Sequence, residues 1–192
     1  MLIAKSNPVG IDVAIGKFQS MLHTALMGKW GLDTEDPAQN ALYECYGRVY
    51  RNKTANGYVA EAYTGNGEYK SVSWNDGLHA LSFFGVGTEE SKEAIGVKSQ
   101  VHLVFFVNLA KLKPSIAHRA DEETRLDVLE LLMPVLRYGF TFTGLETSVE
   151  RAMKEYPASY KGSTATVVDT HPVHCFRLNF ELKHDKFMTN CP

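Results

Sequence analysis

The sequence predicts an α+β fold, in which an antiparallel meander sheet packs against two long helices. Three observations lead to this prediction: two stretches have apolar residues at helical spacing, two Asn-Gly turns separate alternating segments, and one run of β-branched and aromatic residues lies near the middle of the chain. With 44% apolar and 22% charged residues, the 192-residue chain has the composition of a folded domain with one sizeable core.

The first long helix is predicted over residues 11–27. Its apolar residues recur on one helical face, and they are Ile11, Ile15, Phe18, Leu22 and Leu26. Gly28 and Gly31 follow, and glycine commonly stands just past the end of a helix. A polar, turn-prone loop is expected at 32–39.

The meander is predicted from the turns. Residues 43–50 alternate in the manner of a strand, and Asn56-Gly57 and Asn66-Gly67 suit the positive φ angles of a tight hairpin turn. Strands are therefore expected at 58–63 and 68–74. The apolar run at 78–87 fits either a buried strand or a short helix.

The second half of the chain supplies the second helix and the closing strands. Residues 101–109 form the predicted central strand, and 121–136 the helix, which starts with three acidic residues and contains Pro134 near its end. Its expected apolar face consists of Leu126, Leu129, Met133 and Leu136. Strands at 138–145 and 175–182 complete the prediction.

The whole chain, 1–192, is expected to be a single domain with a protruding loop at 85–100 and an arm at 147–169. Twenty Lys and Arg residues against 22 Asp and Glu residues give a formal charge of −2, so no global field draws the protein to nucleic acid or to an anionic membrane. The N-terminal segment lacks the apolar core of a secretion signal, and no stretch is long enough to span a membrane, so cytoplasmic synthesis is expected.

Few motifs suggest chemistry. His171 and His174, next to Cys175, have too few partners at a recognised spacing to predict a metal site, and they fit the turn into the last strand better. The cluster from His118 to Glu123 is explained by a solvated helix start. We therefore predict no catalytic, cofactor or metal site. The three cysteines, which also include Cys45 and Cys191, fit reduced thiols.

Four segments of the chain resemble virion proteins of crAss-like and related phages of Bacteroides-type hosts. The likeness extends over most of residues 42–182 and includes no catalytic motif. The segments are LYECYGRVYRN, NDGLHALSFFGVG, VNLAKLKPSIAHRADEETRLDV and HPVHCFRLNFEL. The order of the predicted elements is also similar to that of tail-terminator and tail-completion proteins, a similarity that concerns fold and not function.

The resemblance implies a structural subunit of the phage neck or tail, located in the virion, and not an enzyme. Such subunits form a closed homo-oligomeric ring, of about 6 or 12 copies, that joins the portal side of the head to the tail. The implied partners are further copies of the chain and the neighbouring neck, portal or tail proteins. DNA passes through the ring without specific binding, which suits a chain of nearly zero net charge.

Two other functions stay open at this point. One is a small phage-encoded or host enzyme whose site includes His118, Asp121, His171 and His174. The other is a monomeric protein-binding module that recruits a partner through a tyrosine-rich face of the sheet. Alanine at the four site positions would abolish turnover in an enzyme, whereas in a ring subunit it would affect only folding or assembly.

Overall fold

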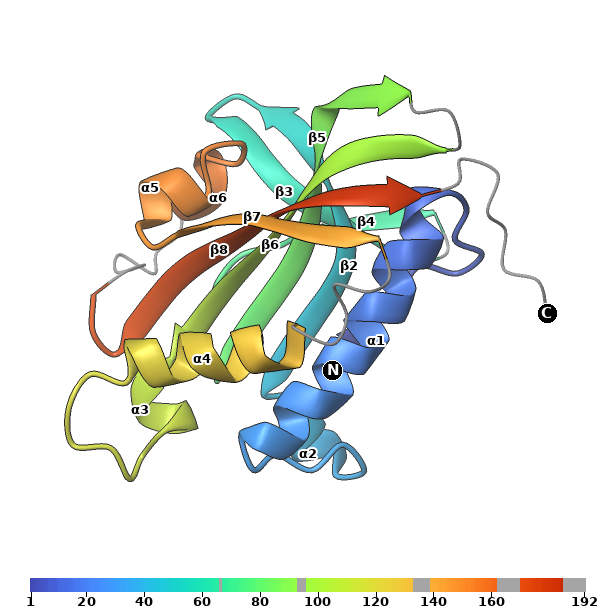
Figure 1. Ribbon diagram of the computed structural model, residues 1–192. Helices are drawn as coiled ribbons and strands as arrows, with labels where there is room; N and C mark the ends of the chain where they lie inside the picture. Colours follow the sequence, from blue (N-terminus) through green and yellow to red (C-terminus); the bar gives the residue numbers. More distant parts are fainter. Residues whose placement is uncertain (66, 93–95, 133–138, 162–169, 185–192) are drawn as a thin grey trace.

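The computed structural model describes residues 1–65, 67–92, 96–132, 139–161 and 170–184. Eight strands in these ranges form one sheet, and seven of them follow the order β4-β3-β2-β5-β6-β8-β7 (Figure 1). The remaining strand, β1, pairs with β2 outside this path. The strands are β1 (Leu2–Ile3), β2 (Tyr43–Thr54), β3 (Gly57–Gly65), β4 (Glu68–Ser71), β5 (Ala80–Lys92), β6 (Val97–Asn108), β7 (Phe140–Glu146) and β8 (Val173–His184).

Two of the six helices in the described ranges exceed a single turn. They are α1 and α4, of 19 and 12 residues, and each of the others has four. The helices are α1 (Ile11–Lys29), α2 (Pro37–Asn40), α3 (Leu109–Leu112), α4 (Asp121–Leu132), α5 (Val149–Ala152) and α6 (Ala158–Lys161).

The predicted α+β fold, a tail-terminator-like antiparallel meander packed against two long helices, was wrong. The meander stops at β2, β3 and β4, because β2 pairs in parallel with β5 on its other side, with Tyr43 opposite Ala80. The sheet is therefore mixed. Asn-Gly turns specify pairing between strands that are neighbours in sequence, whereas no local pattern specifies a parallel pairing between distant strands.

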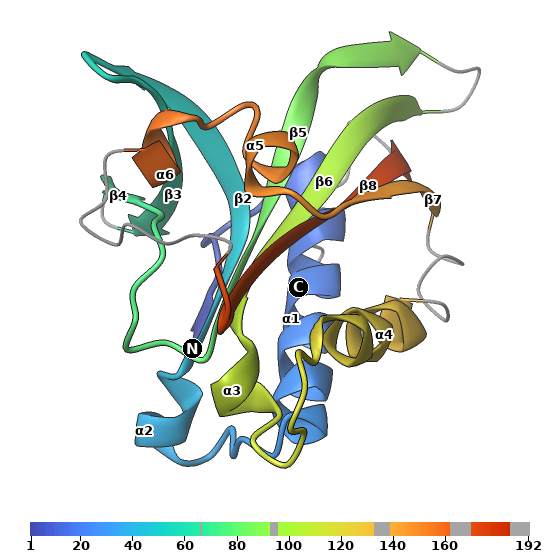
Figure 2. The same cartoon turned by 90° about the vertical axis from the view of Figure 1, so that its left-hand side faces the viewer.

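Helices cover both faces of the sheet, as Figure 2 shows. We call the side with α1 and α4 the helix face and the side with α5 and α6 the pocket face. Side chains alternate along a strand, so β6 contributes Leu103 and Phe105 to the core under the helix face and Val104 and Phe106 to the core under the pocket face. Because both faces of β6 are buried, its sequence is an almost continuous apolar run.

Most single elements were predicted correctly. The helix at 11–27 is confirmed as α1, and the strands at 43–50, 101–109, 138–145 and 175–182 are confirmed as β2, β6, β7 and β8. The undecided run at 78–87 belongs mainly to strand β5. None of the helices in the described ranges has the length and hydropathy needed to cross a membrane.

Two predicted irregular segments differ in the structure. The expected loop at 85–100 is the outer half of a β-hairpin, because β5 continues to Lys92 and β6 starts at Val97, and this hairpin extends beyond the rest of the sheet (Figure 1). The described part of the expected arm at 147–169 carries α5 and α6. It packs on the pocket face, where Val149 and Ala152 are buried. Residues 162–169 lie outside the described ranges.

Helix α4 turns a different side to the core than its pattern predicted. Leu126 is 53% exposed, whereas Asp127 and Val128 are buried. Asp127 Oδ2 accepts from the Trp30 indole at 3.1 Å and lies 2.6 Å from Lys113 Nζ, so the buried carboxylate is paired. Leu129 of the predicted face is partly buried and packs against the core under the helix face. Met133, Pro134 and Leu136, which include the predicted kink, lie outside the described residues.

A buried glutamine fixes α1 to the sheet. Gln19 Nε2 donates to the carbonyl oxygens of Ile3, at 2.9 Å, and Cys45, at 2.8 Å. The Cys45 carbonyl lies where the β2–β5 register shifts, between Cys45 and Arg48, so the amide satisfies backbone at an irregular point of the ladder.

Candidate functional site

The four residues of the enzyme hypothesis do not share one environment. His118 is exposed and lies 3.6 Å from Glu123, and His171 is also exposed. His174 is buried at the start of β8. Arg119 connects two of the segments, since its guanidinium donates to His174 Nδ1 at 3.3 Å and its Nε lies 3.4 Å from Asp121.

These contacts agree with a structural role for both motifs. The segment 171–174 leads into β8, where the Pro172 carbonyl accepts from the Leu109 amide at 2.8 Å, and the acidic residues begin α4. Within the described ranges, no group of three or more His, Cys, Asp and Glu side chains is placed to hold a metal ion. Cys45 and Cys175 are both buried, and Cys191 lies outside these ranges.

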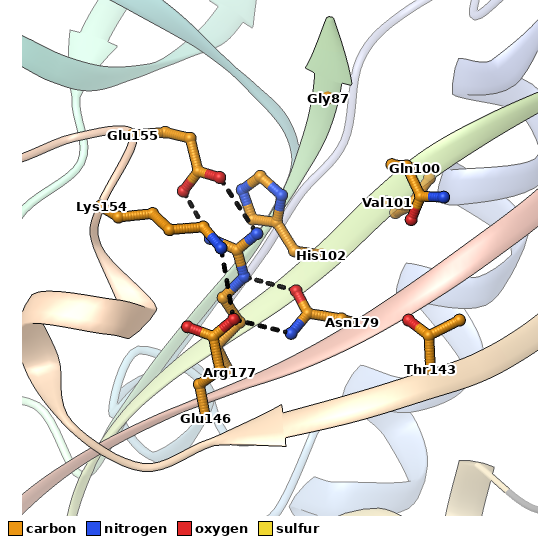
Figure 3. A pocket seen from close by; sticks show the side chains of 10 residues that line it. All are labelled: Gly87, Gln100, Val101, His102, Thr143, Glu146, Lys154, Glu155, Arg177 and Asn179. Carbon is orange, nitrogen blue, oxygen red and sulfur yellow. Dashed lines mark hydrogen bonds and ion pairs between the residues drawn. The ribbon is translucent and has the colours of Figure 1, made fainter. Parts of the chain in front are cut away.

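The chemistry-bearing side chains meet elsewhere, in a pocket of about 530 Å³ on the pocket face. Its floor comes from β5, β6, β7 and β8, and its wall from the segment after α5 (Figure 3). We call it the polar pocket, and its lining residues are Gly87, Gln100, Val101, His102, Thr143, Glu146, Lys154, Glu155, Arg177 and Asn179.

A network around Arg177 forms one side of the polar pocket. Arg177 is 5% exposed, its guanidinium binds both carboxylate oxygens of Glu155, and its Nε donates to Asn179 Oδ1 at 2.6 Å. Asn179 Nδ2 in turn donates to Glu146 Oε1 at 3.1 Å, and Lys154 Nζ lies 3.3 Å from the same oxygen. Two cations and two carboxylates therefore offset each other's charge.

His102 lies at the base of the polar pocket and is 3% exposed. Its Nε2 is 3.3 Å from the Tyr156 hydroxyl. Burial, together with the positive charges of Arg177 and Lys154, holds the pKa of His102 well below its usual range, so the imidazole is neutral at pH 7.

Gly85 makes room for this pair. It lies directly opposite His102 in the β5–β6 ladder, and a Cβ atom at Gly85 would be 2.0 Å from His102 Nε2 and 2.4 Å from the Tyr156 hydroxyl. These separations are far below van der Waals contact, so glycine is required there for steric reasons and not for an unusual φ angle.

The end strands of the sheet form a second candidate site. On β7, Phe142 is 40% and Leu145 38% exposed, and on β4 Tyr69 is 57% exposed. Phe142 packs on Phe180, which belongs to the core under the helix face. Tyr69 pairs with Tyr63 of β3. Because side chains alternate along a strand, this tyrosine pair also lies on the helix face. Both ends of the sheet thus expose apolar groups on the helix face.

Aromatic side chains gather at the β4 end, as the tyrosine count suggested. Tyr69 makes edge contacts with Tyr50 and Tyr63, with ring centroids 6.0 and 5.4 Å apart. The Arg48 guanidinium lies over the Tyr50 ring at 5.0 Å. Such clusters are enriched at protein interfaces and also stabilise strand pairs.

The sequence reasoning missed the polar pocket. Its local signals were weak: Gly85 and Gly87 fall at the start of the predicted loop, His102 is a single polar residue near the start of an apolar run, and Arg177 and Asn179 alternate in a strand that is otherwise largely apolar. These residues come together only through the register of β5, β6 and β8. The sequence matches no protein-family model and no curated protein at a significant level.

Proposed function

We propose that the chain is a structural subunit that associates with further copies of itself through the two ends of its sheet. A neck or tail ring of a phage virion is the assembly that the sequence resemblance implies. The observation that carries the proposal is the exposure of Tyr69 on β4 and of Phe142 and Leu145 on β7. Exposed apolar groups on end strands are typical of sheets that gain a partner.

The strand directions support head-to-tail association. Following the pairings from β7 through β8, β6, β5, β2 and β3 to β4, the two end strands run in opposite directions. A neighbouring copy in the same orientation would therefore present its β4 antiparallel to β7, with the apolar groups of both strands on one face. Repetition of such a heterologous contact closes into a ring when the rotation permits.

The same end strands have features that oppose pairing. β4 has only four residues and contains Lys70, and the β7–β8 register shifts between Phe142 and Gly144. Short edges, lysines and bulges keep the sheets of monomeric proteins apart. A monomeric module that binds another protein through its tyrosine cluster is therefore the second candidate function, and the oligomeric state separates the two.

The test is the mass of the purified protein in solution, followed by negative-stain imaging. The proposal expects closed rings, of about 6 or 12 copies. Leu145→Lys should dissociate them, because a charge would enter an apolar contact. Leu126→Lys, on the exposed side of α4, is the matched control and should leave the rings intact. A monomer at every concentration, or an open filament, contradicts the ring.

A further inference from the structure

We propose that the polar pocket binds an uncharged ligand rich in hydroxyl groups, such as a sugar. This inference does not depend on self-association. It follows from three features of the polar pocket: the balance of its charges, a nitrogen of the His102 ring that has no partner within the described residues, and a glycine in its floor. Its volume of about 530 Å³ lies in the range of small-molecule sites.

The charge balance excludes strongly ionic ligands. Arg177 is held by Glu155, and Lys154 by Glu146, so each cation of the polar pocket has a carboxylate beside it. An anionic ligand would meet both carboxylates, and a cationic ligand both cations. Either would lose its hydration without a net electrostatic gain. A neutral ligand loses less hydration energy than an ion does, and hydrogen bonds in the polar pocket can replace that hydration.

The polar pocket offers donors and acceptors that the protein does not use. His102 Nε2 is occupied by the Tyr156 hydroxyl, and its Nδ1 has no hydrogen-bond partner in the described part of the chain. The Thr143 hydroxyl is likewise unpaired there, and Gln100 uses its Nε2 on Glu181, which leaves its Oε1. A hydroxyl group both donates and accepts, so it satisfies each of these atoms in either tautomer of His102.

The floor lets a ligand come close to the backbone. Gly87 of β5 has no side chain, and it lies beside Gln100 on the neighbouring strand. A glycine inside a strand often marks a close approach of a ligand. Gln100 and Thr143 lie across the polar pocket from Glu155 (Figure 3), so a ligand over Gly87 would have polar groups on both sides.

The experiment uses D-glucose, D-galactose and N-acetyl-D-glucosamine as probes, with sodium phosphate as the charged comparison. Binding is measured by saturation-transfer NMR and by shifts of the backbone amides of β5, β6 and β8 in ¹⁵N-labelled protein. We expect at least one sugar to bind with a Kd of about 1–10 mM and phosphate not to bind.

The matched variants are Thr143→Tyr, which fills the open side of the polar pocket, and Thr141→Tyr, which adds the same ring two residues away on β7, outside the lining. We expect Thr143→Tyr to weaken sugar binding at least about tenfold and Thr141→Tyr to change it by less than about twofold. Circular dichroism verifies that both variants fold. Failure of all three sugars to bind, binding of phosphate at the same amides, or unchanged binding by folded Thr143→Tyr overturns the proposal.

Discussion

Replacing Gly85 with alanine adds one methyl group at the most crowded point of the pocket face. The new carbon would lie 2.0 Å from His102 Nε2 and 2.4 Å from the Tyr156 hydroxyl. Both neighbours are buried, since His102 is 3% and Tyr156 1% exposed. The substitution must therefore displace two buried rings or the strand itself.

The magnitude follows from two terms. Forcing extra volume into a packed core costs about 1–3 kcal/mol. Separating His102 from Tyr156 leaves buried polar groups without their partner, which costs about another 1–3 kcal/mol. We expect Gly85→Ala to lower the free energy of unfolding by about 2–6 kcal/mol, and each kcal/mol to lower the Tm by about 2–4 °C.

Urea unfolding measures this change through the midpoint, provided that the slope stays constant. Gly16→Ala is the matched control. Apart from the chain neighbours and the backbone of α1 itself, no atom lies within 4 Å of a Cβ at Gly16, in the interior of α1, so the same substitution should stabilise by about 0.5–1 kcal/mol. A loss below about 0.5 kcal/mol in Gly85→Ala would refute the steric account of this glycine.

Three further substitutions test the core. Gln19→Ala removes the side-chain donor to the buried Cys45 carbonyl and to the part-buried Ile3 carbonyl, and it should cost about 1–3 kcal/mol of unfolding free energy in urea. Asp127→Ala removes the acceptor of the Trp30 indole and should cost about 3 kcal/mol, whereas the exposed Glu130→Ala should cost less than about 0.5. Burial lowers the pKa of His23 to about 4. The contribution of the neutral imidazole to the free energy of unfolding is therefore complete above about pH 6.5 and is lost as the pH falls toward 4. Urea unfolding measured at a series of pH values should show a shallower loss of stability in His23→Gln.

Local sequence patterns predicted several elements well. The apolar spacing from Ile11 to Leu26 fixed the position of α1, because residues three and four apart share one side of a helix. Asn56-Gly57 predicted the β2–β3 hairpin, in which Thr54 pairs with Gly57. These signals act between residues that are near in sequence, so they do not depend on the rest of the fold.

The same patterns gave wrong predictions where contacts with residues distant in sequence determine the local structure. Leu126 matched the expected apolar face of α4, yet the helix buries Asp127, because Trp30 at the end of α1 supplies a donor for the carboxylate. The polar outer half of the β5–β6 hairpin resembled a loop, because its glycines and charges lower strand propensity and cross-strand pairing restores the strand.

The sequence by itself determined where most strands and the first helix lie, and it indicated a folded chain without a strong net charge. The tertiary structure alone decided that β2 and β5 run in parallel and that His102 lies between Gly85 and Asn179 on neighbouring strands. The reason is physical. Register and strand order depend on contacts between residues far apart in sequence. The energies of these contacts reflect the packing of the whole sheet, and they produce no periodic pattern in the sequence.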